Sequence, residues 1–305
     1  MTYKTIVVGH GPSETAREAV ALAAMFARPG ARVIATEVCE FDPYVPRVGV
    51  AEWQRYLLED AQKRLEEAKE RAPFQEGVEL DLQVATRSSA ARGLQEVAED
   101  VGADLIVVGS SHRGKLGRML AGGTAESLLR GAPCAVAVAP RGFGADGVPE
   151  LRRIGVGYDG SPEARLALDA AVALAKEHGA ELRIVTIVTP PAIPPVGTTY
   201  SIGEAELGLL EEAAKERLDE AIEHVGPGVA VDGVTRMGSP LAALEEEAEA
   251  LDLLVVGSRG YGPLRRALLG SVSQALMRSV SCPMLVTPRG AREHGDDAGE
   301  GEDGS

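Results

Sequence analysis

The chain has 305 residues, of which 45% are hydrophobic and 25% are charged, a composition typical of globular domains and not of disordered or fibrous proteins. At about 150 residues per domain, this length predicts two domains. The formal net charge of −15 argues against non-specific binding to nucleic acid or to anionic membranes, because contacts with phosphates need a positive protein surface.

Features that would direct the chain out of the cytoplasm are not evident. No apolar run approaches the roughly 18 to 20 residues that cross a bilayer, and the start of the chain does not resemble a signal peptide. The cysteines Cys39, Cys134 and Cys282 are widely spaced and form no CxxC pair, so we expect neither a zinc site nor a disulfide framework. These observations predict a soluble cytoplasmic protein.

The second half of the chain repeats the first at a constant shift of 148 residues. The shift aligns Val107–Ser110 with Val255–Ser258, and Cys134 with Cys282. Self-similarity of this length at one offset indicates a tandem duplication.

The duplication predicts domains at residues 1–145 and 150–290. The segment between them contains Gly and Pro, which is typical of a linker. Residues 291–305 are rich in acidic residues and Gly, so we expect them to form a disordered tail.

Short apolar strands alternate with helices in each repeat. In the second repeat the expected strands are 153–158, 181–188, 229–236, 251–258 and 283–287, and the expected helices are 162–176, 204–224, 240–250 and 271–280. Ser161 and Pro162 provide an N-cap and a first helical residue at the start of the first helix. This alternation predicts the α/β class, with doubly wound parallel sheets covered on both faces.

Two glycine-rich segments of the second repeat lie at the carboxyl ends of strands, where open parallel sheets bind ligands. One is Tyr158–Ser161. The other begins with Gly257 and Gly260 and, after nine intervening residues, continues with Gly270 and Ser271. Glycine allows close approach to a phosphate, and a helix start supplies unpaired N–H groups. Ser271 and Ser273 add hydroxyl groups, so the pattern predicts a site for a nucleotide phosphate chain.

Simpler interpretations of the same residues remain open. Glycines at strand ends often serve only as turns, Ser271 has the residue type of an N-cap, and Asp159 has the residue type of a cap for the helix that follows it.

The pattern Gly257–Ser–Arg–Gly260, nine residues, then Gly270–Ser271 resembles the nucleotide signature of the universal stress protein family. The opening Val156–Ser161, the turn Gly238–Pro240 and the start of the last strand at Cys282–Pro283 also resemble that family, and the resemblance covers nearly all of both repeats.

The resemblance implies a Rossmann-like fold with five strands per domain, of the adenine nucleotide alpha hydrolase-like type, and bound ATP, with Mg²⁺ as a possible companion. It places Asp159 beside the ribose and adenine, and the backbone near Ile187 against adenine. Gly257 and Gly260 would line the ribose-phosphate loop, and Gly270, Ser271 and Ser273 would lie at the phosphates.

The first repeat departs from this signature. The shift places Gly11 opposite Asp159, His112 opposite Gly260, and Gly123 opposite Ser271. We therefore expect the first repeat to bind nucleotide weakly or differently.

No catalytic or metal-binding constellation is evident, so the leading hypothesis is an ATP-binding stress-response regulator and not a dedicated enzyme. A slow ATPase that uses Asp159, and an interaction module indifferent to nucleotide, remain alternatives. Strands 135–139 and 283–287 would expose unpaired edges, so we expect the repeats to pair through them as a pseudo-dimer, and two chains to form a homodimer.

Overall fold

The computed structural model describes residues 2–41, 50–110, 122–190, 203–258 and 270–288. The first repeat contains β1 (Thr5–His10), α1 (Thr15–Phe26), β2 (Arg32–Glu40), α2 (Val50–Glu70), β3 (Glu79–Arg87), α3 (Ala90–Val101), β4 (Leu105–Gly109), α4 (Gly123–Leu129) and β5 (Ala135–Ala139). The second contains β6 (Arg153–Gly157), α5 (Pro162–His178), β7 (Glu181–Val188), α6 (Glu204–Val225), β8 (Val231–Met237), α7 (Pro240–Ala248), β9 (Leu253–Gly257), α8 (Ser271–Leu276) and β10 (Met284–Thr287). The tail expected at 291–305 lies outside these residues.

All the described strands belong to one ten-stranded sheet, in the order β3-β2-β1-β4-β5-β10-β9-β6-β7-β8. Within each repeat the five strands are parallel, which confirms the predicted α/β class. The winding direction reverses between β1 and β4, and again between β6 and β9. These two reversals are the positions where ligands bind in open parallel sheets.

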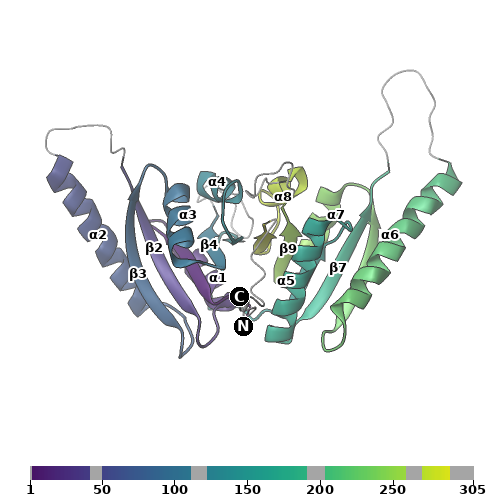
Figure 1. The fold of residues 1–305 in the computed structure, drawn as a ribbon, viewed down its shortest axis with the longest axis horizontal. Helices are drawn as coiled ribbons and strands as arrows, with labels where there is room; N and C mark the ends of the chain where they lie inside the picture. The colour runs from purple at the N-terminus through teal and green to yellow at the C-terminus, as the bar shows by residue number, and fades with distance from the viewer. Residues whose placement is uncertain (1, 42–49, 111–121, 191–202, 259–269, 289–305) are drawn as a thin grey trace, which may run out of the picture.

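The two repeats join where β5 and β10 pair in antiparallel orientation, with Ala137 opposite Leu285. Both strands are fully buried and, apart from Thr287, apolar, so their pairing satisfies backbone groups that would otherwise form exposed sheet edges. In Figure 1 this seam lies at the centre of a V, whose arms end in the long helices α2 and α6. Association of two such chains stays a prediction.

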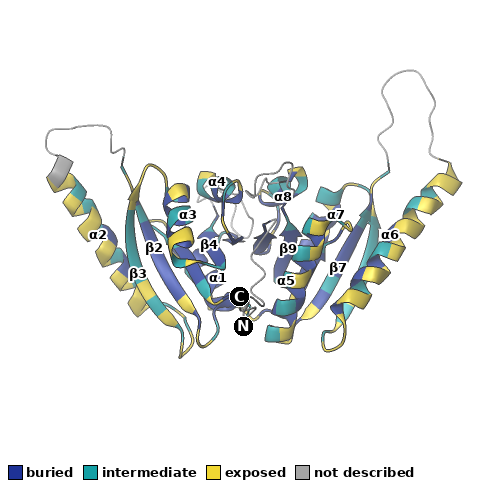
Figure 2. Cartoon of the chain, viewed as in Figure 1, coloured by how far each residue is buried: buried dark blue, intermediate teal, exposed yellow. Residues whose placement is uncertain are grey.

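Helices cover both faces of the sheet. One apolar core packs α1, α5 and α6 against one face, and the other packs α3, α4, α7 and α8 against the opposite face. Both cores run across the seam, and Figure 2 shows buried residues along the sheet and exposed ones on the outer sides of α2 and α6. None of the described helices is both long and apolar enough to cross a membrane.

An aspartate before the fourth strand of each repeat ties that strand to the first. The carboxylate of Asp252 accepts hydrogen bonds from the backbone N–H groups of Arg152 and Arg153, each at 2.8 Å. Asp104 does the same for the start of β1, at 2.9 Å. The Asp–Leu pair shared by the two repeats therefore has a structural role.

Element boundaries differ from the sequence prediction mainly at helix ends. The helix α8 ends at Leu276 and not at residue 280, because the backbone N–H groups of Arg278 and Ser279 bond to oxygens only three residues back, in tighter turns. The predicted strand 181–188 matches β7. At the start of α5, the Ser161 hydroxyl accepts from Ala164 N–H at 3.1 Å, as predicted for an N-cap.

The end of α5 contacts the first repeat through Glu177 and His178. The Glu177 carboxylate accepts from the backbone and hydroxyl of Thr2, and pairs with Arg28 at 3.7 Å. Partial burial and the neighbouring Arg28 lower the pKa of His178 to about 4. The ring is therefore neutral in the folded protein at neutral pH.

We expect His178 to make stability depend on pH. Because its folded pKa lies below the unfolded value of about 6.5, the unfolded chain takes up the proton first as the pH falls. Stability that is complete above pH 6.5 is then lost towards pH 4. The free energy of unfolding falls between pH 7.5 and 5. With allowance for the ring's partial exposure, this fall should be about 1 kcal/mol smaller in His178→Gln. Urea unfolding at both pH values measures this, and an identical loss in both proteins would contradict it.

Candidate functional site

A cavity lies at each of the two winding reversals. The second cavity, in the second repeat, is lined by Gly157, Tyr158, Asp159, Ser161, Glu163, Ala164, Ile187, Thr189, Pro240, Leu244, Val256, Gly257, Gly270, Val272 and Ser273. These residues come from the ends of β6, β7 and β9 and from the starts of α5, α7 and α8. Segments far apart in the chain thus meet at the carboxyl edge of the sheet.

The loop after β6 places Asp159 just before the start of α5. Its Oδ1 accepts from the backbone N–H of Ser161 at 3.0 Å, and Gly160 adopts a φ of +82° that favours glycine. The guanidinium of Arg217, on α6, donates to the Asp159 carbonyl at 3.2 Å. Asp159 therefore stabilises its own turn, while Ser161 is the N-cap of the helix. Asp159 is thus not the cap of α5 but a turn residue before it, and it also lines the cavity.

Gly257 ends β9 directly against the first turn of α5. A Cβ placed on Gly257 would lie 2.5 Å from the backbone oxygen of Glu163, closer than non-bonded atoms approach. Its counterpart Gly109 meets the backbone of Thr15 in the same way. Glycine is thus required here by packing between strand and helix, whatever ligand the cavity holds.

The start of α8 forms the floor of the second cavity. Gly270 is the N-cap of α8, and its neighbour Ser271 is exposed and does not line the cavity. The hydroxyl of Ser273 is buried and donates to the carbonyl oxygen of Gly257 at 3.1 Å. Ser273 therefore fastens α8 to the end of β9.

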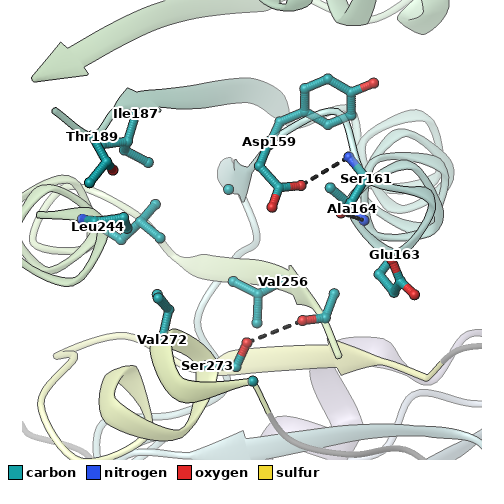
Figure 3. A pocket seen from close by; sticks show the side chains of 15 residues that line it. Asp159, Ser161, Glu163, Ala164, Ile187, Thr189, Leu244, Val256, Val272 and Ser273 are labelled. Carbon is teal, nitrogen blue, oxygen red and sulfur yellow. Dashed lines mark hydrogen bonds between the residues drawn. The ribbon is translucent and has the colours of Figure 1, made fainter. Parts of the chain in front are cut away.

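One wall of the cavity is apolar and the opposite wall is polar. Figure 3 shows Ile187 and Leu244 on one side of the cavity and Asp159, Ser161 and Glu163 on the other. Val256 and Val272 lie along the lower side of the view. An apolar wall suits a flat organic ring, whereas carboxylates suit hydroxyl groups or a cation.

The backbone of Ile187 has an open edge on this cavity. Pairing of β6 with β7 ends at Gly157 and Val185, and the next residue of the first strand, Tyr158, donates to the Val185 oxygen. Backbone groups two residues apart in a strand point to the same side. The N–H and C=O of Ile187 therefore face the side where β6 has already ended, a donor and an acceptor next to each other.

The first cavity occupies the equivalent place in the first repeat. It is lined by Gly9, His10, Gly11, Ser13, Thr15, Ala16, Thr36, Val38, Ala90, Leu94, Val108, Gly109, Ser110, Gly122, Gly123, Thr124 and Ala125. The repeat alignment places Gly11 opposite Asp159 and Thr15 opposite Glu163. Both lining carboxylates of the second cavity are thus replaced by uncharged residues.

The three cysteines are free and buried. Cys134 and Cys282 are buried, and burial raises the pKa of each thiol to about 12. Burial and the nearby Glu37 also raise the pKa of Cys39. Within the same parts of the chain, no three or more His, Cys, Asp and Glu side chains are grouped to hold a metal ion.

The structure brings together most of the residues proposed from the sequence. Asp159, Ile187, Gly257, Gly270 and Ser273 line the second cavity, Ser271 lies beside it, and Gly260 is outside the described residues. Sequence reasoning missed the side chains of Glu163, Leu244 and Val272. Glu163 stands in the first helical turn after the loop, a position that could have signalled it, whereas the two apolar residues look like ordinary core positions.

Comparison with known proteins gives one consistent result. The sequence profile of the universal stress protein family matches residues 2–140 and again 150–288. A universal stress protein of Mycolicibacterium smegmatis is 35% identical over 240 residues, covering 77% of each chain. One of Mycobacterium tuberculosis is 36% identical over 189 residues, 60% of this chain and 61% of that protein, so the match spans about three fifths of the relative's length. A universal stress protein structure from Archaeoglobus fulgidus has a TM-score of 0.70 at 20% identity, covering 94% of this chain and 98% of that one, and shows the shared fold.

We expect Gly257→Ala to destabilise the protein by about 1–3 kcal/mol, because the added methyl group must push β9 away from α5. The matched control is Gly208→Ala at an exposed position of α6, where no atom lies within 4 Å of the new Cβ. That change should be neutral or stabilise by up to about 1 kcal/mol. Thermal unfolding of both variants measures the difference. Equal stabilities would contradict the close contact between Gly257 and the first turn of α5.

Proposed function

Because the chain belongs to the universal stress protein family, we propose that its second cavity binds ATP and that the protein acts as a nucleotide-dependent stress-response regulator. The observation that carries the proposal is the second cavity itself. It combines an apolar wall, an open backbone edge and a carboxylate-bearing loop at the winding reversal of a parallel sheet.

Adenine recognition is the part best supported by geometry. The base would lie against Ile187, Leu244 and Val272, which line the cavity from β7, α7 and α8. The N–H and C=O of Ile187 match the neighbouring acceptor and donor on the edge of adenine. A guanine edge reverses the order of donor and acceptor, so this backbone pair favours adenine.

The carboxylates explain why a cation would accompany the phosphates. Asp159 and Glu163 both line the cavity, and a triphosphate beside them meets like charges. Mg²⁺ is commonly held by one or two carboxylates together with substrate phosphates and water, so these two side chains fit that role. The ribose hydroxyls would donate to Asp159, as the family resemblance implies.

Regulation through binding is favoured over turnover. The described residues that line the second cavity include no histidine, lysine or cysteine. Their titratable groups are Asp159, Glu163 and the buried phenol of Tyr158, whose hydroxyl oxygen accepts from Arg165 at 3.3 Å. A slow ATPase would have to use one of the two carboxylates to orient water, and this is the second candidate function.

In the presence of Mg²⁺ we expect Asp159→Asn to weaken ATP binding about tenfold, because the amide keeps the turn to Ser161 but removes the carboxylate proposed to accept from the ribose and to hold the cation. Asp169→Asn is the matched control, since Asp169 lies on α5, the helix that follows the Asp159 loop, and pairs with His224 without lining the cavity. Isothermal titration gives the affinities. ATP at 100 times its Kd should also stabilise the wild type by about 2.7 kcal/mol. No thermal shift at millimolar ATP would favour the nucleotide-independent interaction module.

We also expect one ATP per chain, because the first cavity lacks the equivalent of Asp159. Titration of the wild type gives the stoichiometry, and two equal sites would contradict the prediction. A steady-state phosphate-release assay run beside it should show no turnover above background. Turnover that is abolished by Asp159→Ala would establish the ATPase instead.

A further inference from the structure

The first cavity keeps the shape of a ligand site but has a different chemistry. Its described lining contains no carboxylate, because Gly11 and Thr15 stand where the second cavity has Asp159 and Glu163. The first cavity is therefore less negative than the second by two charges. No carboxylate in the described lining would accept from the hydroxyl groups of a ribose or repel an anion.

The imidazole of His10 replaces the phenol of Tyr158 at the edge of this cavity. Its Nδ1 lies 3.2 Å from Oε2 of Glu37, the residue opposite it on β2. Glu37 is almost completely buried, and hydrogen bonds from His10 and from Arg64 of α2 hold its pKa below the usual range despite that burial. Arg64 is itself paired with Asp60.

This arrangement orients the ring of His10. Since Nδ1 is engaged by Glu37, Nε2 is the ring atom left for the cavity that His10 lines. In its protonated form the imidazole donates from both nitrogens, to Glu37 on one side and to a bound anion on the other. The groups that face it are Glu37 from β2 and, behind it, Arg64 and Asp60 from α2.

Ser110 supplies an independent sign of a missing partner. The residue lines the first cavity and is only 3% exposed, and its hydroxyl has no hydrogen-bond partner. A buried hydroxyl without a hydrogen-bond partner destabilises the protein, and a ligand that bonds to it removes this cost. Its counterpart Ser258 is also without a partner but does not line the second cavity. A residue with an orphaned hydroxyl thus lines a cavity only in the first repeat.

We propose that the first cavity is a separate site for a phosphate dianion, either inorganic phosphate or the phosphate of a small monoester, with no selection for a nucleoside. The residues that line it include His10, Ser13, Thr15, Ser110 and Thr124, whose side chains carry hydrogen-bond donors. A dianion needs several such donors and no neighbouring carboxylate. The proposal goes beyond ATP binding by the second cavity and does not depend on it.

The test is titration of the full chain with inorganic phosphate, glycerol 3-phosphate and AMP. Gly11→Asp introduces the acid that the second repeat carries. No atom lies within 4 Å of its new Cβ and the residue needs no positive φ, so the variant should fold. We expect phosphate affinity to fall at least tenfold in Gly11→Asp and about tenfold in Ser110→Ala, with no change in the matched control Ser258→Ala.

The three ligands distinguish the possible sources of the phosphate group. Tighter binding of glycerol 3-phosphate than of inorganic phosphate identifies a monoester, and the reverse identifies the free ion; both agree with the proposal. Unchanged phosphate binding in Gly11→Asp would overturn it. So would AMP binding that Gly11→Asp weakens and that is more than tenfold tighter than phosphate binding. ATP titration of the same variants reports on the second cavity, so failure of one site is distinguishable from failure of the other.

Discussion

The contact between Gly257 and the first turn of α5 is the constraint on which the second cavity depends. Because Gly257 has no side chain, the end of β9 reaches the backbone of Glu163, and the loop after β6 must turn sharply above it. Ser273 then fastens α8 to the carbonyl of the same glycine. Strand end, helix start and loop therefore form one packed unit, and the cavity is the space left beside it.

The same contact between a strand-end glycine and a helix backbone occurs in both repeats, although the side chains that line the two cavities differ. Gly109 repeats the contact in the first half of the chain, so both repeats keep a cavity at the winding reversal. Only the lining differs, with carboxylates in one and an imidazole and hydroxyls in the other. The helices α4 and α8 lie on either side of the seam (Figure 1), and Arg278, just after α8, pairs with Glu126 of α4 at 2.7 Å.

Much of the fold follows from local patterns. Apolar runs such as 181–188 and the Ser161–Pro162 start of α5 specify their elements because strand burial and helix capping act within a few residues. Helix ends were harder to predict, as α8 shows, since a helix and a tighter turn differ by small energies. The glycine signature located the cavity correctly, although packing explains Gly257 without any ligand.

The sequence by itself determined the duplication, the α/β class and the position of the cavities, because repeats, periodicity and glycines at strand ends are properties of the chain order. Only the tertiary structure decided which side chains share a cavity. In the sequence Leu244 and Val272 look like core residues, and only the placement of α7 and α8 beside β7 makes them cavity residues. The pairing of His10 with Glu37 likewise appears only when β2 lies next to β1. These contacts join residues far apart in the chain, and their geometry is fixed by the packing of helices on the sheet and not by local sequence.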